Sequence, residues 1–142
     1  MYHLIIPVIF CLILIPFTYA GDKVGEKRLV GGQCEYKKYE GGAQITSITR
    51  IVGSVADPNE RDQVKFKFIP YGRVEETFAQ IEGREFSLTL INSSYPGRRF
   101  LEKYGIEVGK VFDCYLKVIT KGTCTPIFFE FPSIKLDDFS EN

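Results

Sequence analysis

The sequence predicts an all-β protein, β-rich with one short helix. From Cys34 onward, apolar and polar residues mostly alternate, which is typical of strands that bury one face. Turns that contain glycine or proline separate these runs at the intervals expected of a small barrel or sandwich. A single segment has helix cap candidates and one apolar stripe, and it interrupts the series of strands.

The first three predicted strands follow one another as a meander. They cover residues 42–52, 63–70 and 84–92. The first is rich in β-branched residues and follows a glycine pair that favours a bend or bulge. In the second, Lys65 and Lys67 alternate with apolar residues, so the two lysines face away from the core.

The predicted helix lies between Pro96 and Tyr104. Ser93 and Ser94 are its cap candidates, and Gly105 ends it. Two further strands are expected after it, at residues 111–119 and 126–131. The last segment, 134–142, is expected to be a tail that frays after Ser133.

The order of three strands, one helix and two strands resembles the OB-fold, a five-stranded barrel with its helix between the third and fourth strands. The resemblance is one of topology and covers residues 33–133. The alternative is a small β-sandwich. On an OB barrel the second and third strands and nearby loops form the usual ligand surface. The resemblance therefore implies a ligand face at Lys65, Lys67, Tyr71, Arg73 and Arg84.

The same topology implies a disulfide between Cys34 and Cys124. If the chain near Ala43 pairs with Val111, Cys34 approaches the turn that precedes Cys124. Cys114 is out of register with Cys124 by roughly 16 Å along a strand, whereas a disulfide needs Cα atoms within about 7 Å. We therefore expect Cys114 to be a buried free thiol.

The first 20 residues form an uncharged, mostly apolar run that is typical of a secretory signal peptide. Thr18 and Ala20 place small residues where a signal peptidase cuts, so cleavage before Gly21 is expected. The alternative is an uncleaved membrane anchor. Residues 21–32 are rich in glycine and charge and are expected to be a flexible linker. The mature protein is then secreted or periplasmic, with no membrane span.

Composition excludes several classes of chemistry. Eighteen basic and eighteen acidic residues balance, so net charge does not direct the chain to nucleic acid. The one histidine, His3, leaves with the signal peptide, which removes Ser-His and Cys-His nucleophiles from the mature chain. No cofactor or metal is expected, because the acidic loop at 57–62 lacks the glycine and distal glutamate of a calcium loop. The triplet at Asn92 matches a glycosylation acceptor.

These observations favour an exported, non-catalytic binding module for a protein, peptide or glycan. One alternative is a small hydrolase, because paired carboxylates cleave glycosidic bonds without histidine. Its candidate acids are Glu75, Glu76, Glu82 and Glu85. The other is a binder of single-stranded nucleic acid or another anionic ligand through the basic face. The sequence does not indicate an oligomeric state.

Mass spectrometry of the exported protein is expected to show Gly21 as its first residue, because the apolar run ends there in small residues. The measurement is made on both the soluble and the membrane fraction. An intact Met1 in the membrane fraction would show that the segment is an anchor instead.

Overall fold

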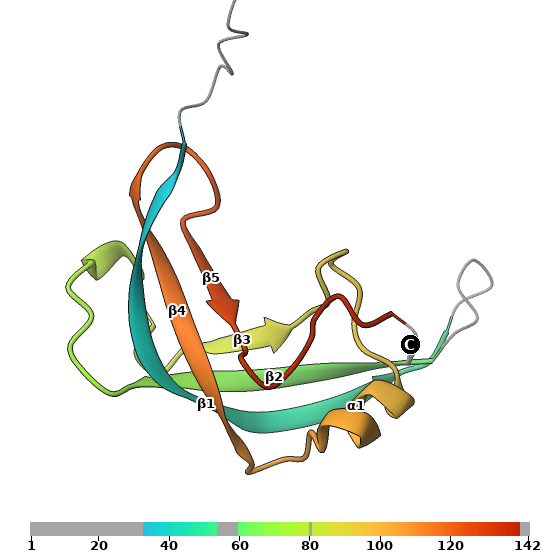
Figure 1. Ribbon diagram of the computed structural model, residues 1–142. Coiled ribbons are helices and arrows are strands. Elements are labelled where there is room, and N and C mark those ends of the chain that lie inside the picture. Colours follow the sequence, from blue (N-terminus) through green and yellow to red (C-terminus); the bar gives the residue numbers. More distant parts are fainter. Residues whose placement is uncertain (1–32, 54–59, 80, 140–142) are drawn as a thin grey trace, which may run out of the picture. The chain divides into compact units, whose positions relative to one another are not determined.

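The computed structural model describes residues 33–53, 60–79 and 81–139. The predicted signal peptide and the linker at 21–32 lie outside these residues. The elements, in chain order, are β1 (Glu35–Ile51), β2 (Arg61–Pro70), the 3-10 turn η1 (Thr77–Ala79), β3 (Glu85–Leu88), α1 (Arg98–Tyr104), β4 (Val111–Lys121) and β5 (Ile127–Glu130). The predicted order of three strands, one short helix and two strands is confirmed (Figure 1).

The five strands form one antiparallel sheet in the order β3-β2-β1-β4-β5, which curls into a half-barrel (Figure 1). The long central strand β1 pairs with β2 from Gly41 to Ile51 and with β4 from Glu35 to Gln44. Within the described residues, β3 and β5 each pair on one side only. We call the space between these two edge strands the seam.

Two glycines lie where β1 is paired on both sides. A Cβ atom on Gly41 would lie 2.5 Å from the carbonyl oxygen of Ile69 and 2.5 Å from the ring of Phe68. A Cβ atom on Gly42 would lie 2.8 Å from a methyl carbon of Val111. Because real side chains do not tolerate such contacts, glycine is required here for β2 and β4 to approach β1.

The core lies inside the curl and is rich in phenylalanine. Phe66 of β2 is buried and packs edge-on against Phe129 and Phe131, with ring centroids 5.1 and 5.4 Å away. Phe86 of β3 contacts Phe129 of β5 with ring centroids 4.6 Å apart. Aromatic side chains therefore join the two edge strands across the seam, where no β3–β5 backbone ladder forms in the described residues.

The chain between β3 and α1 differs from the prediction. β3 ends at Leu88, although Leu90 continues the buried side. The two serines do not cap the helix, because Ser94 instead donates from its N–H and hydroxyl to the Asn92 side-chain oxygen, at 3.0 and 2.7 Å. The N-cap is Gly97, with no side-chain hydrogen bond. The helix ends as predicted at Gly105, whose φ of 61° is left-handed.

The expectation that the chain frays after Ser133 is wrong for residues 134–139. Ile134 is 3 % exposed and belongs to the core. The Ile91 N–H donates to the carbonyl oxygen of Leu136 at 3.1 Å. The Asp138 carboxylate accepts from the Tyr104 hydroxyl at 2.8 Å. Apolar burial and these two hydrogen bonds hold residues 134–139 against the rest of the domain. Their stabilisation outweighs the conformational entropy that usually makes a terminus fray.

The predicted disulfide forms between Cys34 and Cys124, with Cα atoms 6.2 Å apart. The register differs by one residue from the prediction, since Ala43 pairs with Phe112 rather than Val111. Cys114 is a buried free thiol, and burial raises its pKa to about 12. Disulfides of this kind are typical of oxidising compartments.

Replacing Cys34 with serine is expected to lower the free energy of unfolding by roughly 2–5 kcal/mol, because the bond closes a long loop in the unfolded chain. The measurement is chemical denaturation, with non-reducing peptide mapping of the wild type to establish the linkage. Cys114→Ala is the control, because it removes a core sulfur without a crosslink. A map that links Cys114 to Cys124 would contradict the strand register.

Candidate functional site

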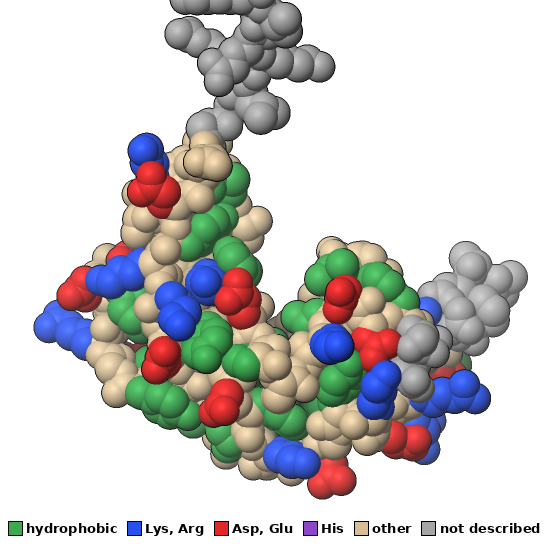
Figure 2. Space-filling view, viewed as in Figure 1, with side chains coloured by type: hydrophobic (Ala, Val, Ile, Leu, Met, Phe, Trp, Pro, Cys, Tyr) green, Lys and Arg blue, Asp and Glu red, His purple; other side chains and the backbone are tan. Residues whose placement is uncertain are grey.

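The face drawn in Figure 2 carries lysine, arginine, aspartate and glutamate side chains interspersed, with no wide area of one sign. This matches the formal net charge of zero. An interspersed surface does not steer a strongly charged partner over long distances. The candidate sites are therefore pockets in which a few charged groups meet apolar walls.

The loop after β2 is fastened to β1 by four side chains, which we call the clasp: Lys37, Tyr39, Glu75 and Glu76. The Tyr39 hydroxyl donates to the Glu76 carboxylate at 2.5 Å and accepts from the Glu75 N–H at 3.3 Å. Lys37 forms an ion pair with Glu75. These contacts hold the loop against the buried side of β1, where Tyr39 pairs with Leu116 of β4.

The ion pair of the clasp shifts both of its pKa values. The hydrogen bond from Lys37 lowers the pKa of Glu75, and the same bond raises the pKa of Lys37. Because the folded-state pKa of Glu75 is lowered, its stabilisation is present above the unfolded pKa of Glu75 and is lost as pH falls through the folded value. Both groups are solvent-exposed, so the pair orients the loop more than it stabilises the fold.

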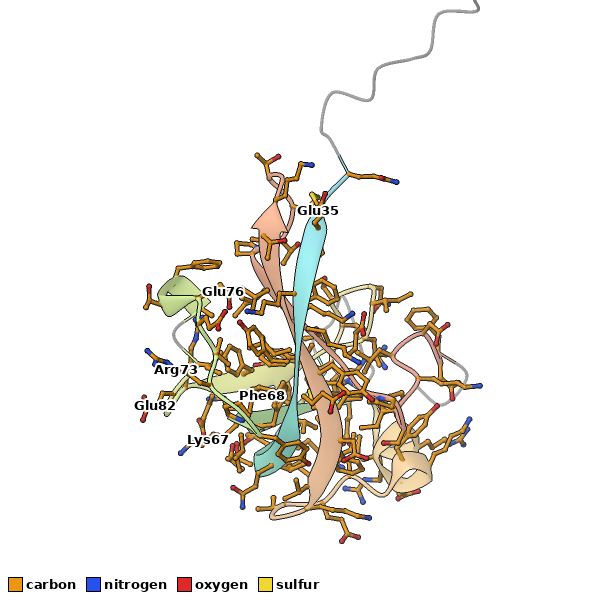
Figure 3. The ribbon with its side chains drawn as sticks, turned by 60° about the vertical axis from the view of Figure 1, so that its left-hand side comes forward. Glu35, Lys67, Phe68, Arg73, Glu76 and Glu82 are labelled. Carbon is orange, nitrogen blue, oxygen red and sulfur yellow. A yellow bond between two sulfur atoms is a disulfide. The ribbon has the colours of Figure 1, made fainter. Side chains whose placement is uncertain are left out.

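Beneath this loop lies a pocket of about 580 Å³, which we call the loop pocket. Its walls come from the end of β2 and from the loop around η1. They are formed by Phe68, Ile69, Pro70, Gly72, Arg73, Val74, Glu76, Thr77, Ile81, Glu82 and Gly83. Figure 3 shows the loop carrying Arg73, Glu76 and Glu82 at one side of the sheet. The pocket thus combines an apolar surface with charges of both signs.

The structure places the five residues of the predicted ligand face on β2, in the loop after β2 and just before β3. Among them, Arg73 lines the loop pocket. Lys67 is exposed on β2 opposite Glu85 of β3, and Lys65 precedes it on the same side of the strand. Tyr71 is 71 % exposed and lies beside Gly42. Arg84 stacks on the ring of Phe86, 5.0 Å from its centroid.

Of the four acids singled out from the sequence, Glu76 and Glu82 line the loop pocket. Glu75 is held by Lys37, and Glu85 lies on β3 opposite Lys67. The sequence did not indicate Lys37 and Tyr39 as part of the site. Their partners lie 38 and 37 positions away, and no periodic pattern connects residues at such separations.

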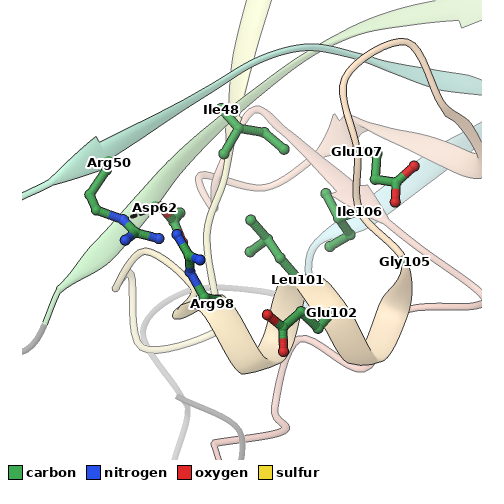
Figure 4. Close-up of a pocket in the computed structure, with 9 residues that line it drawn as sticks. All are labelled: Ile48, Arg50, Asp62, Arg98, Leu101, Glu102, Gly105, Ile106 and Glu107. Atoms are coloured by element: carbon green, nitrogen blue, oxygen red, sulfur yellow. Dashed lines mark hydrogen bonds and ion pairs between the residues drawn. The ribbon is translucent and has the colours of Figure 1, made fainter.

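A second pocket, of about 250 Å³, lies between β1, β2 and α1. Asp62 is only 5 % exposed there and accepts from Arg50 Nε at 3.3 Å, while its N–H donates to the Pro96 carbonyl at 2.8 Å. Figure 4 shows Arg98 reaching from α1 toward Asp62 and Arg50. The Asp62 N–H fastens the segment before α1 to the sheet, and the buried Asp62 carboxylate is paired with Arg50 of β1, so we assign this cluster a structural role.

The described residues contain no group of three or more side chains placed to hold a metal ion. Comparison with protein-family models, with curated proteins and with solved structures finds no significant match. Function is therefore inferred from the geometry of the loop pocket and its clasp.

The substitution Tyr39→Phe is expected to loosen the loop, because it removes the hydroxyl that bonds both Glu75 and Glu76. Hydrogen exchange of the Glu75 amide should become faster, with a loss of about 0.5–1.5 kcal/mol in the free energy of unfolding. Tyr36→Phe is the matched control, since that hydroxyl donates to the Thr125 carbonyl at 3.0 Å, outside the clasp. If the hydrogen-exchange rate of the Glu75 amide is the same in Tyr39→Phe as in the wild type, the Tyr39 hydroxyl does not hold the loop.

Proposed function

We propose that this chain is an exported, non-catalytic binding module whose ligand enters the loop pocket. The observation that carries the proposal is the pocket itself. Its volume of about 580 Å³ falls within the range of roughly 300–1,000 Å³ common for ligand sites. Apolar walls with a few polar groups that fix orientation are also typical of such sites.

The chemistry of the pocket favours a ligand with an apolar body and polar groups of two kinds. Glu76 and Glu82 accept hydrogen bonds, and Arg73 donates them. Ile69, Val74 and Ile81 offer apolar surface beside these groups. A peptide or a glycan carries both hydrogen-bond donors and acceptors on a partly apolar framework. Either one can be part of a larger protein partner.

Export is supported by two independent features. The disulfide joins Cys34 to Cys124, and disulfides persist mainly in oxidising compartments such as the periplasm or the extracellular space. The N-terminal apolar run is typical of a secretory signal peptide. Among the described residues, no helix has the length and apolar character needed to cross a membrane.

A carboxylate-based hydrolase is the second candidate function, and one observation favours it: Glu76 and Glu82 line the same pocket. A pair of acids on either side of a glycosidic bond can cleave it without histidine. An anionic ligand on the β2–β3 face has weaker support, because Lys67 lies opposite Glu85 and Arg84 stacks on Phe86.

The proposal is tested with the purified, disulfide-bonded chain against panels of short peptides and oligosaccharides. Ligands that raise the unfolding temperature are then titrated by calorimetry. Arg73→Ala is expected to weaken binding by about tenfold or more, the loss typical of a charged hydrogen bond. Lys65→Ala, on the exposed side of β2, should leave binding unchanged.

The state of the recovered ligand separates the two candidate functions. A binding module returns its ligand chemically intact. Cleavage of the ligand that is abolished by Glu82→Gln would establish the hydrolase instead. Equal affinities of the wild type and Arg73→Ala would show that the ligand binds elsewhere than in the loop pocket.

A further inference from the structure

The disulfide fastens the part of β1 that carries the clasp. Within the described residues, β1 pairs with β4 alone over residues 35–40, because its pairing with β2 begins at Gly41. We call residues 35–40 the entry segment. Cys34 directly precedes the entry segment, and its bond to Cys124 ties it to the turn after β4 (Figure 1). A strand end with one neighbour opens more easily than a strand paired on both sides, so this crosslink restrains the entry segment.

The noncovalent contacts at the start of the entry segment are weaker than the disulfide. Lys121 forms an ion pair with Glu35 at 3.1 Å, but both side chains are more than half exposed, and exposed pairs contribute little to stability. The Tyr36 hydroxyl donates to the Thr125 carbonyl oxygen at 3.0 Å, and the Tyr36 ring contacts that of Phe128. The register between β1 and β4 also shifts between Glu35 and Tyr36. Loss of the disulfide therefore leaves this end of β1 weakly held.

The loop after β2 is attached to β1 through this same segment. The contacts of the clasp reach Lys37 and Tyr39, and the Tyr71 N–H donates to the Glu40 carbonyl oxygen at 2.9 Å. All three of these β1 residues belong to the entry segment. Glu76, which accepts from the Tyr39 hydroxyl, also lines the loop pocket. One wall of the pocket is thus positioned by the part of β1 that the disulfide restrains.

A soluble reductant can reach the bond at Cys124. The turn covers Cys34, since a Cβ atom on Gly122 would lie 2.6 Å from the Cys34 sulfur, whereas Cys124 is exposed. The thiolate of a dithiol attacks the Cys124 sulfur and displaces Cys34, which takes up a proton. The second thiol of the reductant then displaces Cys124, which is protonated in turn. Two electrons and two protons pass to the protein, and the dithiol becomes a disulfide.

We propose that the Cys34–Cys124 bond is a redox switch for the loop pocket, reduced by a dithiol and closed again by oxidation. Reduction releases the start of β1, and the entry segment loses its fixed pairing with β4. Tyr39 then no longer holds Glu76, and the pocket loses a preorganised wall and with it affinity for its ligand. The regulatory meaning of the switch rests on the function proposed above, whereas the release of the loop does not.

The test compares the oxidised and reduced forms of the full exported chain by NMR, with dithiothreitol as the reductant. Backbone order parameters of residues 35–40 and 74–77 are expected to fall from about 0.85, typical of rigid backbone, to below about 0.6. Those of α1 (Arg98–Tyr104) should not change. Order parameters describe the native state, so they are insensitive to the general loss of stability that opening a crosslink causes. Reoxidation should restore the original values.

Matched variants separate the disulfide from the other cysteine and test the route through the clasp. Cys34→Ser should show the loop mobility of the reduced wild type without any reductant. Cys114→Ala is the control, because it removes a thiol outside the disulfide, and its loop should respond to dithiothreitol as the wild type does. In Tyr39→Phe the clasp is already broken, so reduction should cause no further loss of order at residues 74–77.

Three results would overturn the switch. The first is equal order of residues 74–77 in the two redox forms, whatever happens at the start of β1. The second is unfolding or a uniform loss of order that includes α1, since the disulfide would then stabilise the whole domain alike. The third is an undiminished response to reduction in Tyr39→Phe. None of these measurements uses a ligand, so the switch and the proposed function can fail separately.

Discussion

The whole fold depends on one strand that is shared by two halves of the sheet. β1 pairs with β2 along its second part and with β4 along its first, and both neighbours are present only from Gly41 to Gln44. Two side chains of ordinary size cannot fit there, because the Phe68 ring and Val111 occupy their space. The glycine pair lets the two neighbours pack closely on β1, so one strand can pair on both sides at this point.

The curl is held at two places by different chemistry. At the start of β1, a covalent bond ties Cys34 to the loop after β4, and closing such a loop stabilises a fold by about 4 kcal/mol in the chain-entropy model. At the seam, the rings of Phe66, Phe86 and Phe129 fill the space between the edge strands. In the described residues, rings pack between β3 and β5 without a backbone ladder, which distinguishes this half-barrel from a closed barrel.

Much of the fold could be predicted because strands and turns have local patterns. The alternation around Phe66 and around Leu116 placed these residues in the core, where both are buried. The predicted register between the first and fourth strands differs from the observed register by one residue. That accuracy was sufficient to identify Cys34 as the partner of Cys124. The predicted serine caps are wrong because Ser94 bonds the Asn92 side chain through its hydroxyl and its N–H, an alternative that local sequence does not distinguish from a cap.

The sequence by itself therefore determined the number, kind and order of the elements, since these depend on periodicity, and the topology that this order resembles implied the disulfide across 90 positions. The tertiary structure alone decided the loop pocket, its clasp, the docking of Ile134 and the packing of rings at the seam. These features join residues such as Tyr39 and Glu76 that lie 37 positions apart. Contacts at that distance arise from how the sheet curves, and no periodic pattern in the loops specifies which residues the curve brings together.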